Sequence, residues 1–461
     1  MSDLFSSKSF SNQRQRTLFA LPAGDAMPDN TEAGGSAGTP RLRVAQRDQV
    51  EFRACCWNDL LPADHQARIV WSFVEDLDLS PLHERMKAVE GSAGRSATDP
   101  RILFALWLYA TLRGIGSARE LARRCEPQTG EVAFQWICGG VTVNHHTLAD
   151  FRTDHVELLD ETLTNSVAVL MQEGLVTLDR VAQDGMKVRA SAGAASFRRR
   201  ATLEDHLQQA EEQIEALKQE LDADPAAANR RQRAARERAA RERAERLQKA
   251  KEQLEEVERK KKADEKEKAR ASTTDPEARV MKMADGGYRP AYNVQLATDT
   301  QSQIITGVDV TNSGGDQGKM APMVEQHETR YDQPPQEMLV DGGFAKKEDI
   351  TEVSPPQGNT TVYAPVQKSK KDDIDPHTPR EKDSPAVAAW RTRMATDEAK
   401  EIYKERAATA ECVNAIARNR GFYQVRVRGA PKVRAVALWY VLAHNLIRTA
   451  TLRAEQAVEM Q

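Results

Sequence analysis

The stretches AYNVQLAT (residues 291–298) and IITGVDVT (residues 304–311) decide the fold. Apolar and polar residues alternate along both, and a short turn separates them, which is the pattern of two antiparallel strands joined as a hairpin. Upstream, residues 177–188 form a further apolar strand. Downstream, the pattern predicts a helix, two short strands and a helical stretch, at residues 318–331, 337–340, 360–366 and 385–420. This order predicts a mixed α/β sheet that is interrupted after its first strand.

A long polar tract, residues 199–272, makes the interruption. It carries two heptad seams, and a break at residues 222–228 that contains Pro225 separates them. A short connector between two such helices favours antiparallel pairing, so we expect a coiled-coil hairpin inserted into the sheet domain. The first seam consists of Leu203, Leu207, Ala210, Ile214, Leu217 and Leu221, and the second of Ala240, Leu247, Ala250, Leu254 and Val257.

The chain before the first strand divides into two parts. Residues 1–48 are rich in Ser, Gly, Asn and Asp without a sustained period, which predicts a disordered arm. Residues 49–175 have helical spacing, and Asp99 followed by Pro100 predicts a capped helix start. Residues 132–152 have a helix–turn–helix outline, although two simply packed helices would give the same pattern. If the outline binds DNA, its second helix presents His145, His146 and Arg152.

Composition excludes several classes of protein. The longest uncharged apolar runs, residues 102–112 and 435–447, are shorter than the roughly 18 residues that a membrane helix needs. No charged and then apolar leader opens the sequence, and the five cysteines form no CxxC pair. We therefore expect a cytoplasmic protein with reduced thiols, without a membrane partner.

The net charge of −3 does not by itself indicate a nucleic-acid binder. Between residues 418 and 434, however, there are six Lys and Arg residues, Arg420 among them, and no Asp or Glu. Such a stretch can neutralise phosphates whatever the overall charge, although a solvated surface has the same composition.

Two aspartates share one context. Asp184 ends an apolar strand and precedes Gly185, and Asp341 ends another and precedes two glycines. Asp-Gly is also an ordinary turn dipeptide. If the two strands are neighbours, however, the two carboxylates repel each other, and a divalent cation relieves the repulsion. Oxygen ligands without nearby His or Cys favour Mg²⁺ or Mn²⁺.

A third carboxylate follows on a predicted helix. At about 100° per residue, Tyr403, Glu411 and Arg418 share one helix face, so a helix packed on the sheet can bring Glu411 to the same cations. Residues 314–319, GGDQGK, are a poor phosphate-binding loop, because the outer glycines are too close and Met320 stands where Ser or Thr binds magnesium. We expect a turn there, from which Asp316 could still approach the site, although Asp316 is not among the predicted site residues.

In this order the motifs resemble the transposases of bacterial insertion sequences that carry an Asp-Asp-Glu triad. The resemblance covers roughly residues 50–450. It rests on Gln-Asp184-Gly, on Val-Asp341-Gly-Gly-Phe, on Tyr403, Arg406, Glu411 and Arg418, and on residues 286–295, 418–422 and 443–446.

The resemblance implies a ribonuclease H-like catalytic core, formed by residues 176–198 and 273–450 and followed by a tail at residues 451–461, with residues 49–175 as an all-α DNA-binding region. It implies two Mg²⁺ or Mn²⁺ ions held by Asp184, Asp341 and Glu411, which catalyse DNA cleavage and strand transfer at the ends of the element. Tyr403, Arg406 and Arg418 would grip the DNA end.

One departure from the family pattern affects Arg406. The family commonly leaves three residues between the Arg and the Glu, whereas four separate Arg406 from Glu411. On an ideal helix this places Arg406 about 140° from Glu411, so we expect Arg406 to lie off the active site. Glu405 and Glu401 are the alternative third ligands.

Two other functions stay open. One is a ribonuclease H-like nuclease that cuts DNA without joining ends. The other is a non-catalytic, domesticated DNA-binding protein, against which the three uncompensated acids argue. A transposase binds its terminal inverted repeats and the target DNA, and a synaptic complex holds both ends together, so we expect at least a homodimer.

Overall fold

The computed structural model describes residues 56–84, 86, 88, 96–223, 230–367 and 375–459. The predicted arm, residues 1–48, lies outside these ranges. None of the helices placed within them combines the length and the apolarity that a bilayer crossing requires.

Short helices fill the chain before the sheet. Asp99 caps α3 with its side chain, which accepts a hydrogen bond from the Arg101 amide at 2.8 Å, and Pro100 is the first helical residue, as the sequence predicts. Almost every side chain of α3 is buried, so this helix forms the centre of the helical part. The helices are α1 (Gln66–Glu75), α2 (Ser80–Glu84), α3 (Pro100–Leu112), α4 (Ala118–Arg124), α5 (Val132–Cys138), α6 (His145–Phe151) and α7 (Val156–Gln172).

Within the described residues, six strands form a mixed sheet with β1 (Arg180–Arg189) at its centre. On one side β1 pairs antiparallel with β5 (Tyr288–Asp299), whose outer edge holds β4 (Arg279–Lys282) and β6 (Ile305–Thr311). On the other side β1 pairs parallel with β7 (Glu337–Leu339), which pairs parallel with β8 (Thr361–Tyr363). The predicted hairpin and the mixed α/β sheet are therefore confirmed.

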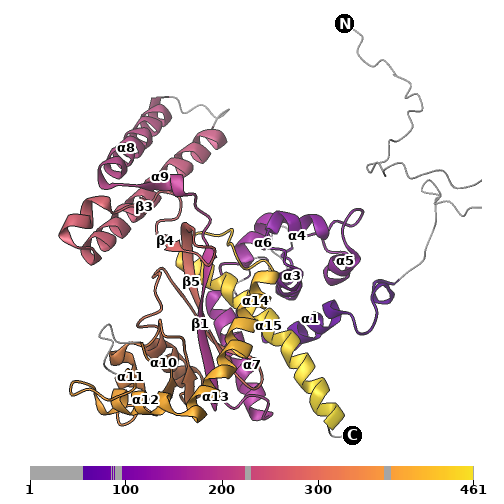
Figure 1. Ribbon diagram of the computed structural model, residues 1–461. Helices are drawn as coiled ribbons and strands as arrows, with labels where there is room; N and C mark the ends of the chain where they lie inside the picture. Colours follow the sequence, from indigo (N-terminus) through magenta and orange to yellow (C-terminus); the bar gives the residue numbers. More distant parts are fainter. Residues whose placement is uncertain are drawn as a thin grey trace, which may run out of the picture. The chain divides into compact units, whose positions relative to one another are not determined.

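Helices follow the strands in the predicted order. They are α10 (Met320–Tyr331), α11 (Lys347–Val353), α12 (Pro385–Ala395), α13 (Asp397–Arg406), α14 (Cys412–Asn419) and α15 (Ala430–Glu459). The turn η5 (Ala407–Glu411) joins α13 to α14 and is π-helical. The long helix α15 packs against α3, α7 and β6 (Figure 1). Its Trp439 ring lies 4.7 Å from the Phe104 ring, centroid to centroid, and thereby joins α15 to α3 in one core.

Between β1 and β5 the chain forms α8 (Arg200–Ala223) and α9 (Arg230–Lys260), which lie side by side (Figure 1). They run antiparallel, because Arg200 at the start of α8 pairs with Glu258 near the end of α9. Where the pair begins and ends, β2 (Phe197–Arg198) and β3 (Ala271–Ser272) form a two-stranded ribbon. The ribbon brings the two ends of the insertion together, so the strand order of the sheet is undisturbed. Leu203, Leu207, Ala210, Leu247, Ala250, Leu254 and Val257 of the predicted seams pack together.

Candidate active site

The register of β1 and β7 brings Asp184 and Asp341 together. The parallel strands pair Ala182 with Leu339, and each aspartate lies two residues beyond that pair along the chain. β7 ends at Leu339, and Asp341 turns into a loop in which its Oδ1 accepts a hydrogen bond from the Gly343 amide at 2.7 Å. The two strands are neighbours, as expected, but the expectation that Asp184 ends its strand is wrong, because β1 continues past it and pairs with β5 as far as Arg189.

Asp184 is a largely buried carboxylate with two side-chain partners. Arg406 Nη2 lies 3.0 Å from Asp184 Oδ1, and Asn414 Nδ2 donates to Asp184 Oδ2 at 2.8 Å. Burial raises the pKa of Asp184, and the charge of Arg406 opposes that increase. The neighbouring charges of Asp341 and Asp316 raise the same pKa further. Asp184 thus lies where negative charge is concentrated.

The expected displacement of Arg406 is wrong, because the helix is not ideal at this point. The four residues between Arg406 and Glu411 lie in the π-helical turn η5. A π turn closes over five residues rather than four, so it takes up one additional residue and returns Glu411 to the face of Arg406. Arg406 Nη1 lies 3.5 Å from Glu411 Oε1. One guanidinium therefore contacts both Asp184 and Glu411.

Burial limits what Arg406 can contact besides these acids. Only 10% of its side chain is exposed. The predicted grip of Arg406 on DNA is therefore corrected, because its charge is turned inward to Asp184. Tyr403 is half-buried beside it, and burial raises the pKa of the Tyr403 hydroxyl, with Arg406, Asp341 and Asp184 as its charged neighbours.

Glu411 reaches the site only through Arg406. Its side chain is 62% exposed. In the described part of the chain, no three His, Cys, Asp or Glu side chains are grouped closely enough to hold a metal ion as they stand. The register places Asp184 and Asp341 at neighbouring strands, and Glu411 is linked to Asp184 through Arg406. The alternative ligands lie elsewhere, since Glu405 pairs with Arg180 and Glu401 with Lys404.

Asp316, which is not among the predicted site residues, lies next to Gly185. Asp316 Oδ1 accepts hydrogen bonds from Asn293 Nδ2 at 2.7 Å and from Gln295 Nε2 at 2.8 Å. Both amides are fully buried on β5. The sequence contains a signal for this contact, because Asn293 and Gln295 are polar residues two apart that point to the same face of a buried strand.

A basic hollow of about 470 Å³ adjoins Gly185. Its lining includes Lys187, Arg189, Lys282 and Arg418, and none of these four cations is within ion-pairing distance of a carboxylate of the described chain. Tyr423, which is 56% exposed, lines the same hollow. Arg418 therefore lies at the surface beside the acids, as its predicted contact with DNA requires.

The residues of the helix–turn–helix outline form α5, a turn at Gly139 with φ +52°, and α6, but α6 packs mainly against α4 and α5 against α3. Asn144 caps α6 by accepting the His146 amide at 2.9 Å. His146 is exposed, and His145 is half-exposed with its ring centroid 4.1 Å from that of His146. Both imidazoles are accessible at the start of the second helix.

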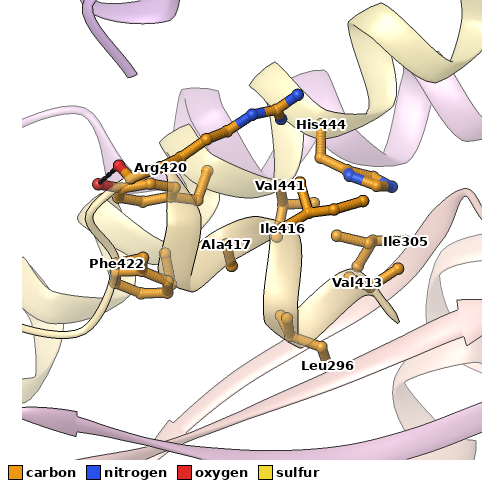
Figure 2. Close-up of a pocket in the computed structure, with 11 residues that line it drawn as sticks. Leu296, Ile305, Val413, Ile416, Ala417, Arg420, Phe422, Val441 and His444 are labelled. Atoms are coloured by element: carbon orange, nitrogen blue, oxygen red, sulfur yellow. Dashed lines mark hydrogen bonds between the residues drawn. The ribbon is translucent and has the colours of Figure 1, made fainter. Parts of the chain in front are cut away.

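Of two further predicted DNA contacts, Arg152 is buried, which corrects its prediction, and Arg420 is half-buried. Arg152 lies over the Trp107 ring at 4.7 Å and donates to the Gly116 carbonyl at 2.7 Å, and burial lowers its pKa to about 10. It supports the packing of the helices and is not free for phosphate. Arg420 is half-buried at a small cavity that Ile416, Phe422 and His444 also line, and burial lowers its pKa (Figure 2).

Two segments of the chain match family models. Residues 55–154 match a transposase domain (DUF772), and residues 368–450 match a transposase DDE domain. The second segment contains Tyr403, Arg406, Glu411 and Arg418, whereas Asp184 and Asp341 lie outside both. No curated protein and no solved structure matches the chain significantly.

Proposed function

Because the chain is an insertion-sequence transposase with a DDE domain, we propose that it cuts the ends of its element and joins them to target DNA, with Asp184, Asp341 and Glu411 as the metal-binding triad. The observation that carries this proposal is the parallel register of β1 and β7, which sets Asp184 beside Asp341. Asp184 lies within β1 and Asp341 just after the short strand β7, and two neighbouring carboxylates are costly unless a cation or a base compensates them.

The donor set fits a hard divalent cation. Asp184 and Asp341 offer carboxylate oxygens, and Asn414 adds a buried Oδ1 that no hydrogen-bond donor of the described chain reaches. Such oxygens suit Mg²⁺ or Mn²⁺. Two bound ions would polarise the scissile phosphate and stabilise the attacking and leaving oxygens. Glu411 joins the set when its carboxylate turns from Arg406 to the ion.

The chain's own residues position the acids and the DNA. Arg406 keeps Asp184 and Glu411 on one side of the helix, and Tyr403 packs beside Arg406. Arg418 and the other cations of the basic hollow carry the phosphates of the DNA end toward Gly185. Arg420 is half-buried and lines a separate small cavity with Ile416 and Phe422.

Each part of the chain has a place in this scheme. The strand order, with three antiparallel strands followed by two parallel ones, supports a ribonuclease H-like core. The helices before β1 bind the terminal inverted repeats, with His145 and His146 at the start of the second helix of the outline. The α8–α9 pair is an inserted coiled-coil hairpin. Holding two ends at once requires at least a dimer.

The decisive test is cleavage of a labelled DNA end of the element in Mg²⁺ or Mn²⁺. Asp184→Asn, Asp341→Asn and Glu411→Gln should each abolish cleavage and retain end binding in a mobility-shift assay. Glu401→Gln, an exposed acid on the same helical stretch that pairs with Lys404, is the matched control and should remain active.

Joining separates the transposase from a nuclease of the same fold. A pre-cut end with a free 3′-hydroxyl should become linked to a plasmid by the wild type. Cleavage without any joining would support the nuclease instead. Full activity of Glu411→Gln would refute the assignment of the third ligand, and end binding without cleavage by the wild type would refute the enzyme.

A further inference from the structure

The turn that follows α14 joins the helical part of the chain to the end of β1. On one side its Gly421, with φ +86°, lies so close to Gly114 that a Cβ atom on residue 421 would come within 3.3 Å of the Gly114 carbonyl oxygen. On the other side the Arg189 amide donates to the Tyr423 carbonyl, and the Val425 amide donates to the Arg189 carbonyl, both at 2.9 Å. Backbone contacts therefore hold the loop between α3 and α4 beside the end of β1.

Three hollows adjoin one another along this turn. The first, of about 750 Å³, lies at the start of α4, and Arg113, Arg119 and Arg426 are part of its lining. The second, of about 520 Å³, shares Arg426 with the first and Tyr423 with the basic hollow beside Gly185. We call the three hollows together the basic groove, which runs from α4 to Gly185.

The cations of the basic groove are exposed and unpaired. Arg113, Arg119 and Arg426 all face solvent, and none of them is within ion-pairing distance of a carboxylate in the ranges that the structure describes. The same holds for Arg189 and Arg418 in the basic hollow. These residues belong to stretches that lie far apart in the sequence, so it is the fold that gathers their charges on one groove.

The acids of the basic groove do not offset these charges. Glu120 already pairs with two arginines of α4, and Asp285 pairs with Arg289. Among the lining acids that the structure describes, this leaves Glu126 without a cation. A row of unpaired cations with so few free acids repels itself, and a polyanion such as the backbone of DNA relieves that repulsion.

We propose that the DNA of the element's end lies along the basic groove, with Arg113, Arg119 and Arg426 on phosphates of the repeat and with the terminus in the basic hollow. This inference rests on the proposed function and adds three phosphate contacts to it. The direction follows from the two ends of the groove. Its first hollow belongs to the helical part, which holds the repeat, whereas its last contains Gly185, the neighbour of Asp184.

His145 connects the basic groove with the helix–turn–helix outline. It lines the first hollow together with Arg113 and Arg119. Base contacts from the start of α6 and phosphate contacts from the two arginines therefore fall on the same stretch of duplex. Because phosphate contacts fix the register of a protein on DNA and base contacts read the sequence, Arg113 and Arg119 set the position from which α6 reads the repeat.

The first test measures how DNA affinity depends on salt. A labelled duplex of the element's end is titrated, without divalent metal, with the wild type and with Arg113→Ala, Arg119→Ala and Arg426→Ala. Each variant should reduce the slope of log affinity against log salt concentration by about 1, and the triple variant by about 3. The control is Arg453→Ala, which removes an exposed arginine that pairs with Glu173 and should keep the wild-type slope. An unchanged slope in the triple variant would overturn the inference.

The second test maps the direction of the DNA and removes one charge at a time. The photo-crosslinking amino acid benzoylphenylalanine replaces Arg119, Arg426, Arg189 or, as the control, Arg453, and the crosslinked nucleotide is mapped on the same duplex. We expect the crosslink from residue 189 nearest the cleavage site, that from 426 next, that from 119 furthest inside the element, and none from 453. The reverse order, or no crosslink from 119 and 426, would overturn the inference.

Neither test requires metal or cleavage, so the two proposals can fail separately. If the wild type gives the expected slopes and crosslinks but never cuts the DNA end in Mn²⁺, the proposed function is wrong and the basic groove is still the DNA-binding surface. If the wild type cuts the end but the triple variant keeps its slope, the path of the DNA is wrong and the proposed function is retained.

Discussion

Deleting Ala408 tests whether the π turn η5 exists to take up one additional residue. Residues five apart on an α-helix point about 140° apart, whereas residues four apart point about 40° apart. Without Ala408, an ordinary α-helix would carry Arg406 and Glu411 four residues apart and on one face. Ala408 is exposed, so its removal sacrifices no buried surface, whereas its neighbours Thr409 and Ala410 are buried and stay in place.

The expected effect of this deletion is therefore small. The contact of Arg406 with Asp184 is retained, so the free energy of unfolding from urea titration should change by less than about 1 kcal/mol. Cleavage of the DNA end in Mn²⁺ should stay within about threefold of the wild type, which is about 0.7 kcal/mol in activation free energy.

The matched control is deletion of Ala415, an exposed alanine in the regular helix α14. That deletion turns every later residue by about 100°, so buried Asn414 and buried Ala417 can no longer keep one face. We expect it to cost more than about 2 kcal/mol and to abolish cleavage. If the chain without Ala408 folds normally but has lost cleavage, the π geometry itself is required, and its interpretation as compensation is refuted.

Three further predictions concern the acids and the DNA. Arg406→Gln leaves the buried Asp184 without its arginine partner and should lower the free energy of unfolding by about 3 kcal/mol. Adding Asp184→Asn to this variant should restore most of the lost stability. If the effects of the two substitutions simply add, the pairing of Arg406 with Asp184 is contradicted. Because the pKa of Asp184 is raised in the fold, protonation stabilises the folded state, so the stability of the wild type relative to Asp184→Asn should increase as the pH falls through that raised pKa. DNA cleavage should fall over the same pH range because a protonated carboxylate is a poor metal ligand. The stability difference and the cleavage rate are both measured between about pH 8 and about pH 4. A stability difference that does not depend on pH would argue against the raised pKa of Asp184. Arg418→Ala should reduce the slope of log DNA affinity against log salt concentration by about 1. Tyr423→Ala should weaken binding of single-stranded DNA by about 1–3 kcal/mol without changing that slope. Lys400→Ala, which removes a lysine that pairs with Asp397, is the control and should change neither quantity.

The strands of the sheet could be predicted because each has its own local pattern. The alternation in β5 and β6, the apolar run of β1 and the Asp341-Gly342 turn after β7 are all visible within about ten residues of sequence, whereas Asp184-Gly185 proves to lie within β1 and not at its end. Their pairing could be inferred only in part. The hairpin of β5 and β6 follows from a short turn, whereas the register that sets Asp184 beside Asp341 joins strands more than a hundred residues apart.

The exposure of the arginines could not be predicted, because the sequence does not distinguish an arginine at the surface from one in the core. Arg152 and Arg418 both lie in or at the end of predicted helices, yet Arg152 stacks on Trp107 whereas Arg418 lines the basic hollow. Tertiary packing alone decides between the two. The π turn could not be predicted either, because the sequence of residues 407–410 is as compatible with a regular α-helix as with a π turn.

The polar atoms around β1 show why this site resists prediction from local rules. Gln183 Oε1, Asn293 Oδ1, Arg406 Nε and Asn414 Oδ1 are all buried without a hydrogen-bond partner in the described chain, and all four residues surround Asp184 or Gly185. A sequence selected for stability alone would fill these positions with apolar side chains, because each unpaired buried polar group opposes folding. Buried polar atoms without a partner also occur elsewhere in the described chain, at Asp275 and Asp349 for example, so they do not by themselves indicate a ligand. Around Asp184 they accompany a carboxylate, and a bound cation would be a partner for the oxygens among them.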